Sequence, residues 1–233
     1  MHNTIYRKLV IGGDISLEES EILDVYKKFI DISGRFLASN DAFMGLEARG
    51  LISFYLIQAS YCFFRGIFNL WIDRGYHSAY LLGRGLVEYY INYCFVLAEG
   101  NDFRAQEFLT AYDKNCDPFG NSKKYKYIVQ RAEEVGLKKL YDLSYKSLCS
   151  FSHPNLKGSL IARRTKKFVE DRPQFLLHML FTFIDLFEIG AMRLGLVYPK
   201  ELKDLIEDTQ TRLKSKIKGE NITPVFKTIH QKS

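Results

Sequence analysis

The residues best suited to chemistry in this 233-residue chain are polar side chains spaced four apart within long apolar stretches. Arg84, Glu88 and Asn92 interrupt the stretch 80–98, where nearly all the remaining positions are apolar or aromatic. Because residues four apart lie on one face of a helix, these three should form one stripe. Inside a bundle such a stripe either cross-links helices or lines a pocket that holds an anion.

A second stripe ends the preceding apolar stretch, where Arg65, Asn69 and Asp73 are again four apart. The dipeptide Arg74-Gly75 follows, and glycine commonly ends a helix. A tight turn at this dipeptide predicts that the two apolar stretches form an antiparallel hairpin.

The hairpin would bring Arg65 close to Arg84, and Gly66 close to Gly83. Two adjacent arginines need an acidic partner or a bound anion. The acidic candidates are Glu88, Asp185 and Glu188. We therefore predict that Arg65 and Arg84 share an anion- or substrate-binding site with Glu88 and Asn92.

A third candidate is a predicted helix end that carries Ser150 and His153, followed by Pro154 and Asn155. A neutral imidazole can act as general base or general acid near pH 7. A histidine in the last turn of a helix also interacts favourably with the helix dipole, so a structural role is equally open. No nucleophile-elbow pattern accompanies Ser150.

The connector that follows, 156–171, is basic and includes Arg163 and Arg164. Clusters of Lys and Arg supply phosphate contacts to nucleic acids. The alternative is a solvated loop, partly neutralised by Glu170 and Asp171.

Eight helices must position these groups. Apolar spacing, capping residues, glycines and prolines predict them at 16–38, 43–73, 76–99, 101–112, 122–135, 138–151, 173–195 and 199–217. The sequence thus predicts an all-α fold, a bundle of seven to eight helices. We expect one domain over 1–217 and a polar C-terminal tail over 218–233.

Composition narrows the classes of protein. A net charge of +6 permits an anionic partner such as RNA or a nucleotide. The four cysteines are far apart and form no metal-ligand pattern, so we predict no metal, no cofactor and a cytoplasmic location. The three longest apolar stretches contain ionisable residues, which favours buried core helices over membrane spans. Apolar, aromatic-rich helices that exceed what one monomer can cover predict a homodimer.

A long apolar helix with Arg84-x-x-x-Glu88, followed by a helix end with Ser150-x-x-His153, resembles a family of bacterial all-α proteins distantly similar to the HEPN superfamily. That superfamily includes toxin and phage-defence ribonucleases. The resemblance covers about 43–196 and implies an HEPN-like core of long antiparallel helices, and a pairing of two such domains. In HEPN ribonucleases an arginine holds the scissile phosphate, and a histidine takes part in acid–base cleavage through the RNA 2′-hydroxyl.

His153 matches that histidine. Lys146 stands where the family has its arginine, and lysine lacks the bidentate fork of a guanidinium. The resemblance therefore implies a metal-independent endoribonuclease with His153, Ser150 and Lys146 as catalytic residues. Arg84 and Asn155 would join Arg163 and Arg164 in binding the RNA.

Two other classes stay open on the sequence. One is a non-catalytic helical module that binds a nucleotide, an RNA or a protein. The other is an enzyme that acts on a small molecule in a pocket between helices 43–73, 76–99 and 173–195.

Overall fold

The structure is a computed structural model that describes residues 14–15, 18–39, 47–98, 103–114, 119, 124–146, 148–149, 172–197 and 199–218. Its elements are β1 Asp14–Ile15, α1 Glu19–Ser39, α2 Ala48–Ile72, α3 Tyr76–Leu97, α4 Phe103–Asp113, α5 Ile128–Glu134, α6 Lys138–Leu140, the π-helix η1 Tyr141–Tyr145, α10 Arg172–Arg193, α11 Lys200–Lys216 and β2 Ile217–Lys218. The helices pack as a bundle, which confirms the predicted all-α fold. The two-residue strands pair antiparallel, with Asp14 opposite Lys218.

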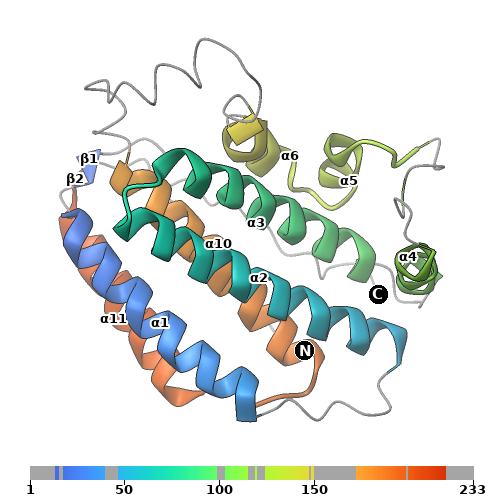
Figure 1. Ribbon diagram of the computed structural model, residues 1–233, viewed down its shortest axis with the longest axis horizontal. Coiled ribbons are helices and arrows are strands. Elements are labelled where there is room, and N and C mark those ends of the chain that lie inside the picture. Colours follow the sequence, from blue (N-terminus) through green and yellow to red (C-terminus); the bar gives the residue numbers. More distant parts are fainter. Residues whose placement is uncertain are drawn as a thin grey trace.

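The hairpin of α2 and α3 occupies the middle of the bundle, and α10 packs behind it (Figure 1). Helices α1 and α11 lie side by side along one flank. Helix α5 and the segment α6–η1 pack against α3 on the opposite flank.

Helix α1 shows why the helix starts were predicted only to within a few residues. Its first hydrogen bonds go to the Glu18 carbonyl, and the Glu21 side chain accepts a 3.2 Å hydrogen bond from the Glu18 N–H. The helix therefore begins at Glu19, and the predicted cap, Ser16, lies outside the described residues. Its buried side chains repeat at helical spacing: Ile22, Tyr26, Phe29, Ile30 and Ser33.

The turn between α2 and α3 confirms the predicted hairpin, although a different residue takes the strained conformation. Arg74 has a φ of 61°, whereas Gly75 has an ordinary negative φ. The Gly75 N–H donates to the Leu70 carbonyl at 2.7 Å, and the Arg74 N–H donates to the Trp71 carbonyl at 3.1 Å. This pair of bonds is the Schellman motif, which satisfies the last carbonyls of α2 and reverses the chain.

The glycines of the hairpin show which side chains fill the space between its helices and their neighbours. Leu82 of α3 packs directly over Gly66, while Gly83 faces α10 and meets Phe175 and Met179. Gly66 and Gly83 therefore do not face each other. Each glycine instead admits a large side chain where a Cβ would clash. Helix α2 runs without a break from Ala48 through Gly50 to Ile72.

The core explains the aromatic share of 15%. Tyr26 stacks on Phe64 with centroids 4.3 Å apart, and Phe64 stacks on Phe183 at 4.2 Å. These rings belong to α1, α2 and α10 and lie in the buried centre of the bundle. The buried Tyr26 hydroxyl donates to the Leu176 carbonyl at 2.8 Å, which satisfies its polar end. These aromatic residues thus serve packing.

In the part of the chain that the structure describes, two helices, α2 and α10, are long and apolar enough to cross a membrane by length and composition. Inside the fold, 78% of the most apolar window of α10 is buried, but only 44% of that of α2. The burial of α10 agrees with the predicted core helix. Helix α2 leaves one face open.

The chain between α3 and α10 departs most from the predicted boundaries. Helix α5 begins at Ile128 rather than near Ser122, and Gly136, with a φ of 72°, ends it as predicted. The predicted single helix 138–151 starts as α6 and continues as the π-helix η1.

Candidate functional site

The π-helix η1 is the local feature that builds the site. The Lys146 N–H donates to the Tyr141 carbonyl five residues earlier, which is the hydrogen bond of a π-turn. The rings of Tyr141 and Tyr145 stack with centroids 5.4 Å apart. Single π-turns occur frequently at functional sites. Here the turn directs the Tyr145 hydroxyl at α3.

Tyr145 joins the two charged members of the α3 stripe. Arg84 Nη2 donates to the Tyr145 hydroxyl at 3.1 Å, and this hydroxyl donates to Glu88 Oε2 at 2.9 Å. The direct Arg84–Glu88 ion pair spans 3.7 Å, and each of these two side chains is 36% exposed. Tyr145 itself is only 6% exposed. We call these three residues the α3–η1 cluster.

Electrostatics keep the Tyr145 phenol neutral. Burial raises its pKa first of all, the negative charge of Glu88 raises it further, and the Arg84 guanidinium opposes both. The hydrogen bond to Tyr145 raises the pKa of Arg84, so the guanidinium keeps its charge. At neutral pH the cluster therefore holds one cation, one carboxylate and a phenol that donates to the carboxylate.

Arg84 has hydrogen-bond donors that no described residue uses. Nη2 is the one nitrogen of Arg84 with a hydrogen-bond partner among the described residues, and Nε is buried without one. A guanidinium has five N–H donors and matches phosphate or carboxylate oxygens. Because the Arg84 side chain is 36% exposed, its Nη1 donors can accept an anion without first breaking the contact with Tyr145.

The two predicted stripes differ from each other, and from the prediction, in their exposure and in their partners. The α3 stripe is half-exposed at its η1 side instead of inside the core, and Asn92 lies outside the cluster. Asn92 Oδ1 is buried and has no hydrogen-bond partner within the described part of the chain. Arg65, predicted to lie close to Arg84, is exposed on α2 and makes no ion pair with any described residue. The two arginines therefore share no acidic partner among the described residues.

The predicted acidic partners from α10 are also wrong. The carboxylate paired with Arg84 is Glu88, from its own helix. Asp185 is 6% exposed within the core, where its charge acts on the Cys94 thiol of α3. Burial comes first among the causes that raise the pKa of this thiol to about 12, so it stays protonated.

The predicted catalytic segment is described only in part. Lys146 is exposed and directly follows Tyr145, and Cys149 lies close enough to Arg84 to affect its pKa. The chain therefore runs past Arg84 just before it reaches Ser150 and His153. The following predicted site residues lie outside the described residues: Ser150, His153, Asn155, Arg163 and Arg164.

Sequence reasoning missed Tyr145 as a site residue. Its only signal was a place four residues after Tyr141 and next to Lys146, and neither spacing points to α3. It also missed the buried arginines of the fold. Arg104 stacks 4.1 Å from the Phe95 ring centroid, and Arg131 stacks 4.4 Å from that of Phe119.

Both of these arginines serve structure. Arg104 donates to the Phe95 carbonyl at 3.1 Å, and Arg131 donates to the Tyr125 carbonyl at 2.9 Å. They are 7% and 6% exposed, so their guanidinium groups are committed to holding α4 and α5 against the rest of the fold.

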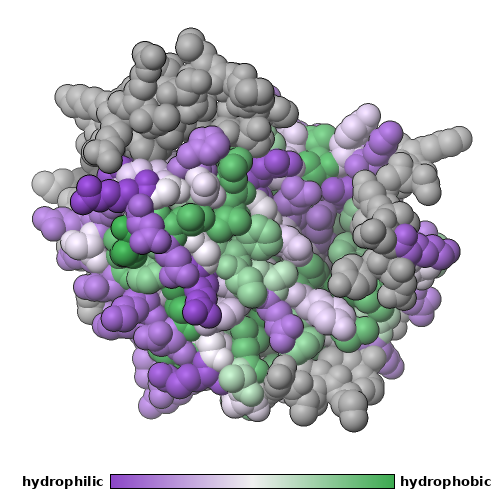
Figure 2. All heavy atoms as spheres, viewed as in Figure 1, coloured by the Kyte–Doolittle hydropathy of each residue, from purple (hydrophilic) through white to green (hydrophobic). Residues whose placement is uncertain are grey.

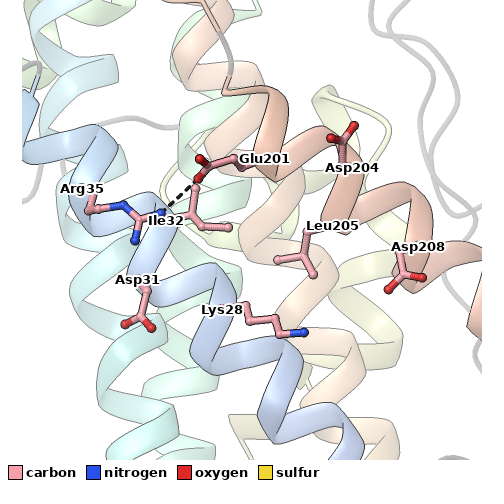
Figure 3. A pocket seen from close by; sticks show the side chains of 8 residues that line it. All are labelled: Lys28, Asp31, Ile32, Arg35, Glu201, Asp204, Leu205 and Asp208. Atoms are coloured by element: carbon pink, nitrogen blue, oxygen red, sulfur yellow. Dashed lines mark hydrogen bonds and ion pairs between the residues drawn. The ribbon is translucent and has the colours of Figure 1, made fainter.

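An open groove of about 460 Å³ lies between α1 and α11 (Figure 3). It is lined by Lys28, Asp31, Ile32, Arg35, Glu201, Asp204, Leu205 and Asp208. Figure 3 shows Arg35 reaching across to Glu201, and their 3.0 Å ion pair is about 68% exposed on both sides. Such exposed pairs contribute little, and the groove contains none of the predicted site residues. The α3–η1 cluster is the better candidate.

Comparison of the chain with protein-family models, with curated proteins and with solved structures finds no match in any of the three. The class that the fold defines is therefore an all-α helical bundle. What the chain does has to be argued from the α3–η1 cluster.

Proposed function

We propose that this chain acts on RNA, with the α3–η1 cluster and Lys146 holding a backbone phosphate and His153 supplying acid–base chemistry. The observation that carries the proposal is the contact between Arg84 and Tyr145. It joins the Arg84-x-x-x-Glu88 stripe to the start of the segment that leads to His153. The contact therefore joins Arg84 of the first motif to Tyr145, which precedes Ser150 of the second motif by five residues.

The chemistry requires a cation for the phosphate and a group that exchanges protons near pH 7. In the proposed reaction the RNA 2′-oxygen attacks the adjacent phosphorus and loses its proton to a base. The 5′-oxygen leaves and takes up a proton, and the products are a 2′,3′-cyclic phosphate and a 5′-hydroxyl. His153 is the proposed proton carrier, and Arg84 the main phosphate ligand that stabilises the developing charge.

The same activity on RNA could serve a toxin or a phage-defence protein, and both roles fit a cytoplasmic ribonuclease. Free thiols at Cys62, Cys94 and Cys149 are consistent with a reducing cytoplasm. No metal enters the proposed reaction, so cleavage should persist in a chelator.

The second candidate is a non-catalytic module that binds RNA, a nucleotide or a protein. One observation favours it. Glu88 already neutralises Arg84 at 3.7 Å, as expected if the ion pair is structural and binds a ligand without catalysis. The third class, a small-molecule enzyme between α2, α3 and α10, has less support. Leu82, Phe175 and Met179 fill the spaces over Gly66 and Gly83 where those helices meet.

The test is cleavage of end-labelled single-stranded RNA in EDTA by the wild type, His153→Ala and Arg84→Ala. We expect His153→Ala to lose cleavage by about 10²-fold or more while it retains binding. Arg84→Ala should lose RNA affinity by about tenfold, since a charge-assisted contact of this size is lost. Arg35→Ala is the matched control, because it removes an arginine from an exposed ion pair far from the cluster.

Equal cleavage by the wild type and His153→Ala would remove His153 from the reaction. Binding without cleavage in every variant would favour the non-catalytic module. Unchanged RNA affinity in Arg84→Ala would remove the cluster as the phosphate site.

A further inference from the structure

The segment 124–127, which leads into α5, alternates lysine with tyrosine and has no part in the proposed function. Its residues are Lys124, Tyr125, Lys126 and Tyr127. Tyr127 is 61% exposed, and the ammonium of the exposed Lys126 lies 5.9 Å from its ring centroid. Figure 2 shows hydrophilic residues gathered on the face over α5. Exposed aromatic rings among basic side chains are typical of surfaces that bind single-stranded nucleic acids.

A buried arginine fixes the backbone of this segment, although three of its four side chains are exposed. Arg131 is 6% exposed, and its Nη1 donates to the Tyr125 carbonyl at 2.9 Å and to the Lys126 carbonyl at 3.2 Å. The Tyr127 N–H donates to Gln130 Oε1 at 3.0 Å. The backbone therefore has little freedom left to lose when a ligand binds, which favours binding.

The two lysines of the segment differ in how their charge is balanced. Lys124 shares the Glu134 carboxylate with Arg104, at 3.5 Å in each case. Lys126 forms no ion pair within the described part of the chain, and the ring of Tyr127 is what its ammonium contacts there. A lysine without a carboxylate partner can bind a phosphate, and such contacts give affinity for nucleic acids of any sequence.

Helix α3 connects this segment to the α3–η1 cluster. The ring of Tyr125 packs against that of Phe95, with centroids 4.8 Å apart. Arg84 and Phe95 both belong to α3, and the helical rise separates them by about 17 Å along its axis. Helix α5 and η1 pack on the same flank of α3 (Figure 1). A stacked strand has one phosphate for about every 3.4 Å, so about five nucleotides span this distance.

We propose that the segment 124–127 is a second contact for the RNA, where a nucleobase stacks on the Tyr127 ring and Lys126 binds the adjacent phosphate. This inference rests on the proposed function, since the first contact is the phosphate at the α3–η1 cluster. It specifies the substrate as single-stranded RNA of about five nucleotides or more. Stacking on a side chain requires an unpaired base, so duplex RNA does not use this contact.

The test measures the affinity of the full chain for a trinucleotide, for a single-stranded RNA of about ten nucleotides and for its duplex, by fluorescence anisotropy in EDTA. Tyr127→Ala should weaken binding of the longer single strand by about tenfold and leave the trinucleotide and the duplex unchanged. Tyr127→Phe keeps the ring and should bind like the wild type. Tyr55→Ala is the matched control, because it removes a tyrosine that is 51% exposed on α2.

A second measurement concerns the phosphate contact. Lys126→Ala should reduce the slope of log affinity against log salt by about one for the longer single strand. Lys27→Ala removes an exposed lysine from α1 and should leave this slope unchanged. Circular dichroism and the urea midpoint of each variant establish that it is folded.

The outcomes separate this inference from the proposed function. Cleavage by the wild type with equal affinity of Tyr127→Ala for the longer strand would overturn the second contact and leave the proposed function standing. An equal loss for the trinucleotide would also overturn it, because that ligand is too short to reach both contacts. A wild type that binds none of the three RNAs would overturn the proposed function and this inference together.

Discussion

Two stripes with nearly the same sequence pattern have different surroundings in the fold. Arg84, Glu88 and Asn92 on α3 and Arg65, Asn69 and Asp73 on α2 are both spaced four apart. The α3 stripe is half-buried because η1 packs beside it and inserts Tyr145 between its charges. The α2 stripe is covered by no described element and stays exposed.

The comparison shows that the role of a charged stripe depends on the element that packs against it, and not on the helix that carries it. Under η1 the ion pair is partly desolvated and linked by a phenol, so it can contribute to stability and hold a ligand. On the open side of α2 the same kinds of side chain are free to meet a second molecule. The predictions below test this difference from the largest expected effect to the smallest.

Removing the side chain through which η1 contacts the α3 stripe should have the largest effect on stability. Tyr145→Ala deletes a side chain that is 6% exposed and carries both hydrogen bonds of the cluster. We expect a loss of about 3–5 kcal/mol in the free energy of unfolding, measured by urea denaturation. Tyr145→Phe keeps the ring and loses the hydroxyl, so it should cost about 1–2 kcal/mol. Equal losses in both variants would show that packing contributes nothing at this position.

Helix α10 extends the comparison to a buried polar group that has no partner among the described residues. Both ring nitrogens of His178 are buried and lack hydrogen-bond partners among the described residues. Burial lowers the pKa of His178 to about 4. Between this value and its ordinary pKa near 6.5, the unfolded chain binds a proton that the folded chain does not.

His178 therefore leaves the free energy of unfolding at its full value above about pH 6.5. This free energy decreases as the pH falls from there through 4. The loss should reach up to about 3 kcal/mol at pH 4 relative to pH 7. His178→Leu should remove this part of the pH dependence and leave that of the carboxylates, as measured by urea unfolding at both pH values. The same pH dependence in the variant and the wild type would show that His178 is hydrated in the fold.

Matched carboxylate-to-amide changes compare the stripes directly. Glu88→Gln removes the charge that accepts from Tyr145 and balances Arg84, and we expect it to cost about 1 kcal/mol. Asp73→Asn makes the same change on the open stripe and should stay within about 0.5 kcal/mol in the monomer. Unfolding midpoints at a concentration below the dissociation constant of the predicted homodimer provide the measurement. Equal costs would mean that η1 does not desolvate the α3 pair.

The sequence was sufficient for what local physics determines. Apolar periodicity, the turn at Arg74-Gly75 and the stop at Gly136 each produced an element or boundary that the structure confirms. The two stripes could be recognised in the sequence, but the elements that pack against them could not be predicted. Spacing along a helix shows which residues share a face and does not show what that face contacts. Gly66 and Gly83 illustrate the limit, since each signals close packing without naming Leu82 or Phe175 as the neighbour.

Tyr145 could not be predicted for a related reason. A π-turn inserts one residue into the helical repeat, which rotates every side chain after it relative to an α-helical projection. The buried arginines depend on tertiary contacts in the same way, because Phe95 and Arg104 belong to different helices.

The smallest effect is expected at the centre of the open stripe. Asn69 is exposed in the helix interior, and its side chain has no partner among the described residues. Alanine has the higher helix propensity, so Asn69→Ala should stabilise the diluted monomer by about 0.5 kcal/mol, whereas Asn69→Gly should destabilise it slightly. The measurement is the urea midpoint at low protein concentration. A destabilising Asn69→Ala at that dilution would mean that the amide is already bonded within one subunit. The open stripe would then be a structural feature like its counterpart on α3, and the contrast between the two would disappear.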